Sequence, residues 1–305
     1  MTLQTPPTFL IVGAARSGTS ALASYIEQHP KVSFTRPKET HFFAFANQSL
    51  NFNGPGDEQL MNRVAVTDPH AFDKLMGELP KENQRGEGSV SSLYYARTAI
   101  ENIRRYCPNV RLIAMLRDPV ERAFSSYQYM RSKGLEPEPE FGAALDAEAQ
   151  RIKDGWHHIW HYASMGRYHR SLSAFRQEFG AEQLKIVFYE DFEKDASAAV
   201  RDIWDFLGEG QVEQLDTRQR INKSGVARNR VIEAGVQMVI NADPLRKLLK
   251  SAIPLSGREA IRNVLFRSTN ISSEDRSRLA TYFADENSRL RQELGRLPDS
   301  WVSGV

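Results

Sequence analysis

The sequence has very little cysteine and lacks long apolar runs. Its single cysteine, Cys107, excludes a disulfide within the chain, so we expect a reducing, cytoplasmic compartment. Cys107 precedes an apolar run, where we expect a small buried residue and not a reactive thiol. No run approaches the roughly 20 apolar residues of a membrane span. The first residues lack the basic and apolar segments of a signal peptide.

The chain also lacks an excess of charge of either sign. Its 40 basic and 38 acidic residues leave a formal net charge of +2, which gives no reason to expect binding to nucleic acid or membranes. Hydrophobic residues make up 41% of the 305 residues, enough for a sizeable core. We find no repeat, low-complexity tract or linker. We therefore expect residues 1–305 to form a single domain.

Three short apolar runs predict buried strands, at residues 9–12, 110–116 and 184–189. Apolar residues at helical spacing follow each run. This alternation predicts an α/β fold in which helices cover both faces of a parallel sheet. Ligands of such sheets bind at the carboxyl ends of the strands.

Two other segments have distinct patterns. Residues 47–85 are polar and irregular, and Gly54, Pro55 and Gly56 mark a loop within them. Residues 272–295 predict one long helix that Ser272 or Ser273 caps, with Glu274 and Asp275 in its first turn.

The first predicted strand leads into a small loop and a helix start. Gly13 ends the strand, and Gly18, Thr19 and Ser20 open the helix. Backbone N–H groups at such a start bind anions. The spacing matches a phosphate-binding P-loop, but Thr19 stands where a nucleotide triphosphatase has lysine, and the positive charge is Arg16. We expect an anion with fewer charges and no obligatory metal; the alternative is a plain strand-to-helix turn.

A second basic group follows the second predicted strand. Asp118 can cap the next helix, and Glu121 has capping-box spacing. Arg122 and Ser125 share a helix face, and an arginine beside a hydroxyl suits a phosphate. Capping does not explain why Arg117 lies at the end of the strand. Two phosphate sites at neighbouring strand ends fit a nucleotide such as 3′-phosphoadenosine 5′-phosphosulfate (PAPS).

The same segments resemble the sulfotransferases that use PAPS. The resemblance rests on VGAARSGTSALASYIEQHP at 12–30, RPKETHFF at 36–43 and RLIAMLRDPVERAFSSY at 111–127. It is nearest to the branch with the heparan sulfate sulfotransferase domains and bacterial relatives. Residues 166–195 resemble the middle segment of the family, and residues 220–230 resemble its late donor-binding loop.

This resemblance implies a P-loop-like three-layer fold, PAPS as co-substrate, no metal, and a small-molecule or glycan acceptor. The residues that would hold the 5′-phosphosulfate are Arg16, Ser17, Gly18, Thr19 and Ser20. Arg117 and Ser125 would hold the 3′-phosphate. The residues that would close over the nucleotide are Lys223, Ser224, Gly225 and Arg228.

Residues 37–43 contain the candidate catalytic base. Sulfuryl transfer is an in-line displacement that needs a group to take the proton of the acceptor. Glu39 matches the general base of the family. His41 is the alternative base, because its unperturbed pKa suits neutral pH, or it is a structural histidine. An extended segment would place both on one side. Lys38 stabilises developing charge or is solvated.

Residues 86–94 resemble a family stretch near the acceptor. With Lys38, they supply Glu87, Ser89 and Tyr94 as candidate acceptor-binding residues. Gly88 stands where the heparan sulfate enzymes have lysine, which weakens the case for a heparan-like polyanion. We expect residues 156–162, rich in aromatics and histidines, to be a packed segment and not a metal site.

Two other functions compete with sulfuryl transfer to a hydroxyl or amine. One is a P-loop kinase or related nucleotide-dependent phosphotransferase, against which Thr19 argues. The other is a nucleotide-binding module without catalysis, against which Glu39 argues. The resemblance favours a carbohydrate or secondary-metabolite hydroxyl as acceptor, and the oligomeric state stays open.

Overall fold

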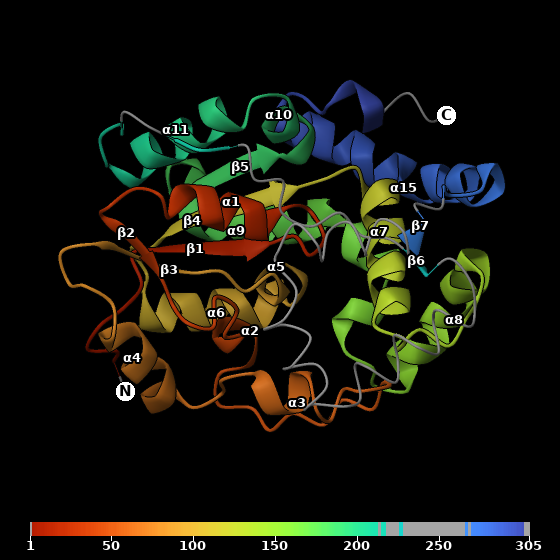
Figure 1. The fold of residues 1–305 in the computed structure, drawn as a ribbon, viewed down its shortest axis with the longest axis horizontal. Helices are drawn as coiled ribbons and strands as arrows, with labels where there is room; N and C mark the ends of the chain where they lie inside the picture. The colour runs from red at the N-terminus through yellow and green to blue at the C-terminus, as the bar shows by residue number, and fades with distance from the viewer. Residues whose placement is uncertain (1, 213–214, 218–225, 228–265, 268–269, 302–305) are drawn as a thin grey trace.

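A parallel five-stranded sheet forms the centre of the protein (Figure 1). The structure, a computed structural model, describes residues 2–212, 215–217, 226–227, 266–267 and 270–301. The strand order is β2 (Val32–Phe34), β3 (Gln84–Glu87), β1 (Phe9–Gly13), β4 (Arg111–Leu116) and β5 (Leu184–Phe188). Every neighbouring pair is parallel, which confirms the predicted α/β fold.

Helices cover both faces of this sheet and make three layers. Helices α6 (Ala96–Tyr106) and α9 (Tyr168–Gln183) pack on one face, and α1 (Thr19–Ile26) and α11 (Ala196–Leu207) on the other. Strand β1 is buried at all five positions, because Leu10 and Val12 enter one core while Phe9 and Ile11 enter the other. This double burial explains why the strand reads as a continuous apolar run.

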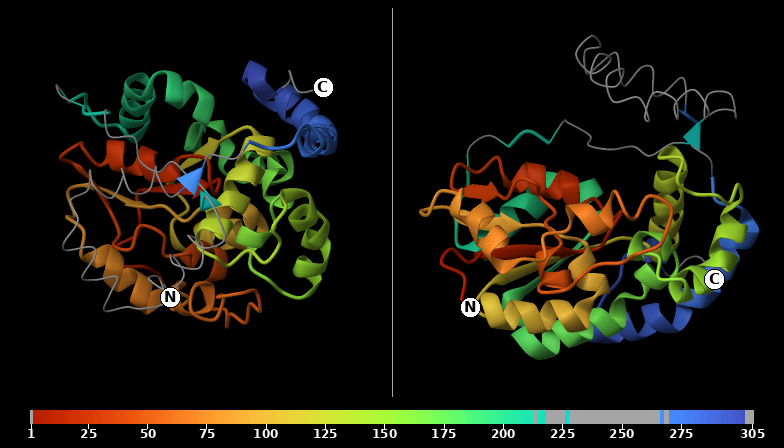
Figure 2. Two further views of the ribbon diagram at one scale, coloured as in Figure 1. Left: turned by 45° about the vertical axis from the view of Figure 1, so that its right-hand side comes forward. Right: turned by 90° about the horizontal axis from the view of Figure 1, so that it is seen from below.

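The other elements surround these layers. They are α2 (Phe42–Phe45), α3 (Met61–Val64), α4 (Pro69–Gly77), α5 (Ser91–Tyr94), α7 (Pro119–Ser132), α8 (Phe141–Lys153), η1 (His158–Trp160), η2 (Ser164–Gly166), α10 (Tyr189–Lys194), α15 (Ser273–Leu294), η3 (Asp299–Trp301) and the antiparallel pair β6 (Val226–Ala227) and β7 (Phe266–Arg267). Helix α15, blue in Figure 2, contacts α7 and α9.

The sequence predicted the longer strands and the C-terminal helix, but it missed several shorter elements. The three apolar runs are β1, β4 and β5, and the predicted C-terminal helix is α15, whose Ser272 cap accepts from the Asp275 N–H at 3.0 Å. The prediction that residues 47–85 are irregular was wrong in part, since the stretch contains α3, α4 and the start of β3, whereas residues 54–56 do lie in a turn. Helix α4 depends on Asp68, which accepts from two first-turn N–H groups. The three- and four-residue strands β2 and β3 are too short for a clear periodicity.

Asp118 caps the start of α7 as the sequence predicts, but the predicted capping-box bond from Glu121 is absent among the described residues. Asp118 accepts from the N–H groups of Val120 at 2.8 Å and Glu121 at 3.2 Å. The capping-box role of Glu121 was wrong: the Asp118 N–H donates to Glu190 at 2.9 Å, and Glu121 pairs with Arg276 instead. Residues from α10 and α15 therefore replace the local reciprocal bond of a capping box.

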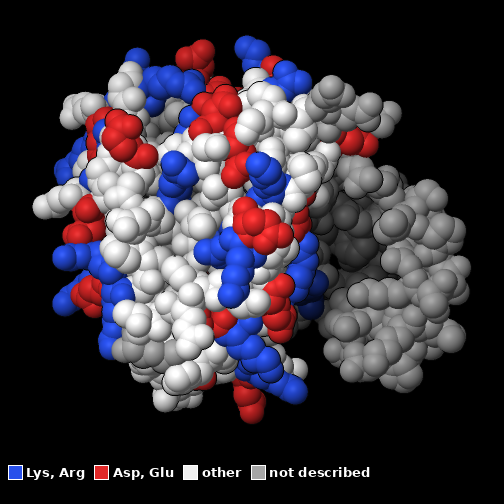
Figure 3. All heavy atoms as spheres, turned by 90° about the vertical axis from the view of Figure 1, so that its left-hand side faces the viewer, with Lys and Arg blue, Asp and Glu red and all other residues white. Residues whose placement is uncertain are grey.

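The exterior fits the small net charge. Basic and acidic side chains are interspersed on the face where β1 begins (Figure 3). Within the described residues, no helix combines the length and apolar character needed to cross a membrane.

Residues 156–162 are packed, as predicted. Trp160 and Tyr162 are fully buried, and Asp57 accepts from the backbone N–H of His157 at 3.0 Å. No group of histidine, cysteine and acidic residues in the described ranges is arranged to hold a metal ion. Cys107 is buried, as expected, and burial raises the pKa of its thiol.

Three histidines near this segment are buried as neutral groups. Burial lowers the pKa of His41 and of His161 to about 4, and it lowers the pKa of His158 as well. His158 stacks on Tyr94, and the Tyr94 hydroxyl lies 2.7 Å from His161 Nδ1. Protonation of these rings is therefore unfavourable in the folded state.

We predict that the free energy of unfolding falls as the pH drops from about 6.5 to 4. The unfolded chain takes up protons near the ordinary histidine pKa of about 6.5, whereas His41 and His161 do so only near 4. Each contributes roughly 1–3 kcal/mol to the loss. Urea unfolding across this range should show a shallower decline for His161→Asn than for the native chain. The exposed His70→Asn should keep the native slope, and an unchanged slope in His161→Asn would contradict the prediction.

Candidate active site

The loop between β1 and α1 forms a compact anion cradle. Arg16 and Gly18 have φ values of 65° and 92°, in the left-handed region. A Cβ on Gly18 would lie 2.9 Å from Tyr189 Cδ2, so this position needs glycine. Within the described residues, no side chain caps α1, which leaves its first-turn N–H groups for an anionic ligand.

The sheet places the second basic group beside this cradle. Strands β1 and β4 are parallel neighbours, and Arg117 directly follows β4. Its Nη1 donates to the backbone carbonyl of Arg16 at 3.4 Å. The two arginines therefore belong to one site and do not lie on opposite flanks of the protein.

Aromatic rings support both guanidinium groups. Arg16 lies 4.5 Å from the centre of the Tyr129 ring, and Arg117 lies 4.8 Å from that of Tyr189. Burial lowers the pKa of Arg16, and the positive charges of Arg117 and Arg122 lower it further. Three neighbouring cations make this region favourable for a ligand with several negative charges.

A cavity of about 470 Å³ joins these groups. Among its lining residues are seven predicted site residues: Arg16, Gly18, Thr19, Ser20, Glu39, Arg117 and Ser125. Tyr129 and Tyr189 also line it, and sequence reasoning missed both. Signals existed for each, because Tyr129 is one helical turn beyond Ser125 and Tyr189 follows β5.

Glu39 is the candidate base that lines the cavity. Its Oε1 lies 3.0 Å from Lys38 Nζ, which also donates to the Gly88 carbonyl at 2.9 Å. A Cβ on Gly88 would lie 3.2 Å from Lys38 Cγ, so glycine leaves room for the lysine stem. The arrangement holds a carboxylate at the edge of the cavity with an ammonium group beside it.

His41, Glu87 and Ser89 lie behind this carboxylate in a buried network. Glu87 Oε1 accepts from the Thr40 N–H at 2.9 Å, and Ser89 Oγ accepts from the His41 N–H at 2.6 Å. Burial raises the pKa of Glu87. His41 has a φ of 59°, so the segment is not the extended one considered above, and His41 Nδ1 lies 2.9 Å from Ser91 Oγ. These residues hold the segment that carries Glu39.

The remaining predicted residues do not line this cavity. Ser17 lies in the cradle loop but is fully buried, and fully buried Arg122 donates to the Tyr162 carbonyl. Tyr94 lines a second cavity, described below. The four residues predicted in the late loop, Lys223, Ser224, Gly225 and Arg228, lie outside the described residues.

Two comparisons with curated proteins bear on this geometry. Mouse heparan sulfate glucosamine 3-O-sulfotransferase 3B1 is 28% identical over 203 residues, covering 66% of this chain and 46% of the relative. Human heparan sulfate glucosamine 3-O-sulfotransferase 6 is 28% identical over 204 residues, covering 66% and 52%. The chain thus spans about half the length of these curated relatives.

A solved structure and a family model extend the comparison. The crystal structure of a sulfotransferase from Alicyclobacillus acidocaldarius matches with a TM-score of 0.73 and 28% identity, covering 97% of this chain and 98% of that one. This match confirms the expected P-loop-like fold. The model of the sulfotransferase family matches residues 7–214, which include the cradle, Glu39, Arg117 and Ser125. This chain therefore belongs to the sulfotransferase family.

Proposed function

We propose that this chain transfers a sulfuryl group from PAPS to a hydroxyl or amine of a small-molecule or glycan acceptor, without a metal. The contact between Arg117 and the Arg16 carbonyl carries the proposal, because it brings two anion sites from neighbouring strand ends into one cavity. A nucleotide phosphorylated on both sides of its ribose presents two separated anionic groups. Residues 16–20 would bind the 5′-phosphosulfate, and Arg117 with Ser125 the 3′-phosphate.

In the proposed reaction, Glu39 takes the proton of the acceptor hydroxyl. The acceptor oxygen then forms a bond to sulfur while the bond from sulfur to the phosphate oxygen breaks. Arg16 and the N–H groups at the start of α1 stabilise the negative charge that the departing phosphate gains. Lys38 keeps Glu39 oriented toward the cavity through the 3.0 Å ion pair.

We also propose that residues 1–305 form one domain. Helix α15 follows the part of the chain that the family model matches, yet it packs on α7 and α9. Its Phe283 and Leu290 are buried in two different core clusters of the protein.

Calorimetry can test the nucleotide. We expect 3′,5′-bisphosphoadenosine (PAP), the product nucleotide, to bind more tightly than ATP with Mg²⁺, and a chelator to leave its affinity unchanged. The physical reason is that the cradle lacks the lysine of nucleotide triphosphatases and offers arginines to two separate phosphates. Preferential binding of ATP with Mg²⁺ would favour the kinase alternative and defeat the proposal.

Arg117→Ala tests the assignment of the two phosphate sites. Loss of a charge-assisted contact of roughly 1.5–3 kcal/mol should weaken PAP about ten- to a hundredfold. Adenosine 5′-monophosphate should lose far less affinity, since it has no 3′-phosphate. Exposed Arg201→Ala on α11 is the matched control. Equal losses for both nucleotides would remove Arg117 from the 3′-phosphate site.

Glu39→Gln tests the base. We expect PAP affinity to stay within about twofold, while transfer of labelled sulfate to acceptors in cell-lysate fractions falls at least about a hundredfold. Glu193→Gln is the control, because Glu193 is another carboxylate that lines the cavity. Transfer by Glu39→Gln within a few-fold of the native rate would show that the base lies elsewhere, and His41→Asn would be the next variant.

A further inference from the structure

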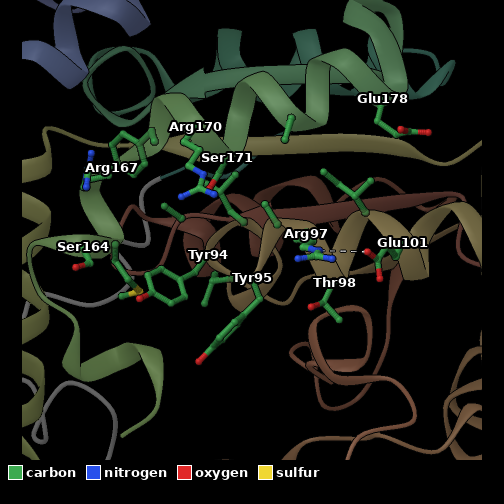
Figure 4. Close-up of a pocket in the computed structure, with 18 of the residues that line it drawn as sticks. Tyr94, Tyr95, Arg97, Thr98, Glu101, Ser164, Arg167, Arg170, Ser171 and Glu178 are labelled. Atoms are coloured by element: carbon green, nitrogen blue, oxygen red, sulfur yellow. Dashed lines mark ion pairs between the residues drawn. The ribbon is translucent and has the colours of Figure 1, made fainter. Parts of the chain in front are cut away.

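A larger groove lies between α9 and the helices α5 and α6 (Figure 4). Its volume is about 790 Å³. Its lining mixes polar and apolar side chains. The apolar ones include Leu93, Ile100, Met165 and Ala174, and the half-buried rings of Tyr94 and Tyr95 add aromatic surface. This apolar part of the lining suits the body of a small organic molecule.

The groove borders the candidate active site. Ala15 and Val90 line both the groove and the cavity that contains Glu39. With Met165 they form a small apolar cluster, against which Tyr94 packs. A ligand that crosses this ridge would therefore touch both spaces.

Most arginines that line the groove pair with a glutamate, but Arg170 pairs with none that the structure describes. Arg104 pairs with Glu178 at 2.8 Å, and Arg167 pairs with Glu286 at 3.5 Å. Arg97 is 3.6 Å from Glu101, but both side chains are largely exposed, so this pair contributes little. Arg170 has no ion pair or hydrogen bond with any other residue that the structure describes.

The side chain of Arg170 points into the groove. Figure 4 shows Arg170 extending from α9 into the space that faces α6, from which Arg97 also projects. The hydroxyls of Ser171 and Thr98 line the same groove. A guanidinium group beside hydroxyls is suited to a carboxylate or a similar planar anion.

We propose that this groove binds the part of the acceptor remote from the reacting hydroxyl, and that the acceptor joins an apolar body to an anionic group held by Arg170. This inference rests on the proposed function, since it takes the sulfuryl-transfer site to lie at Glu39. The reacting hydroxyl lies in the donor cavity, the apolar body crosses the ridge at Val90, and the anion reaches Arg170.

A pair of probes isolates the anionic group. 6-Hydroxy-2-naphthoate and 2-naphthol share a hydroxylated ring system and differ in one carboxylate. We expect fluorescence titration to show the naphthoate binding about tenfold more tightly, a difference of about 1.4 kcal/mol. Arg170→Gln and Arg170→Glu should reduce this preference to within about twofold. Arg201→Glu, the same charge change at an exposed position of α11, should keep it.

A second variant blocks the groove itself. Ala174 lies on α9 and is partly exposed in the groove, so Ala174→Trp should weaken both probes about tenfold. Ala198→Trp, at an exposed position of α11, is its control. Thermal unfolding establishes whether each variant is folded. If Arg170→Glu does not fold, Arg170→Gln alone tests the role of the charge.

Titrations with and without saturating PAP separate this inference from the proposed function. Failure of PAP to bind defeats the proposed function, whereas the probe titrations of the free protein still test the groove. Equal affinity for the two probes, a preference that survives both Arg170 variants, or displacement of the naphthoate by PAP would each overturn the inference.

Discussion

The parallel pairing of β1 with β4 is the constraint on which the site depends. It brings Arg117 to the carbonyl of Arg16, although the two residues are 101 positions apart. The pairing also brings positive charges together, and those of Arg117 and buried Arg122 lower the pKa of Arg16. Burial of every residue of β1 between two apolar cores supplies the stabilisation that holds these charges together.

The sheet order also places buried polar residues where they hold the segment that carries Glu39. Strand β3 lies next to β1. Glu87 at its end accepts from the Thr40 N–H, and Ser89 just beyond it accepts from the His41 N–H. Glu39 and Lys38 thereby stay at the cavity edge while the supporting polar groups are buried. A buried network with its partners satisfied is rigid, which suits the role proposed for Glu39 as a base held in place.

The cavity that contains Glu39 and the groove beside α9 differ in chemical character. The smaller cavity combines helix N–H groups, arginines and a carboxylate, and it suits a phosphorylated nucleotide. The larger groove combines an apolar lining with an arginine that lacks a described partner. They share a border at Ala15 and Val90, and in the proposed reaction the donor lies on one side of it and the acceptor on the other.

Much of the fold and the donor cradle could be predicted from local sequence. The apolar runs, the glycine-rich turn and the Asp118 and Ser272 caps depend on neighbours in the chain, so their patterns are readable without coordinates. Short strands such as β2 and β3 could not be read in this way, because their stability comes from pairing with distant segments.

The sequence by itself determined the α/β class, the anion cradle and the residue types available for catalysis. Only the tertiary structure decided that Glu39 lines the cavity while His41 and Glu87 are buried behind it, and that Tyr129 and Tyr189 support the arginines. The physical reason is that side-chain exposure follows from contacts between distant segments. Thr40 and Glu87, for example, are 47 positions apart, and no local pattern encodes their hydrogen bond.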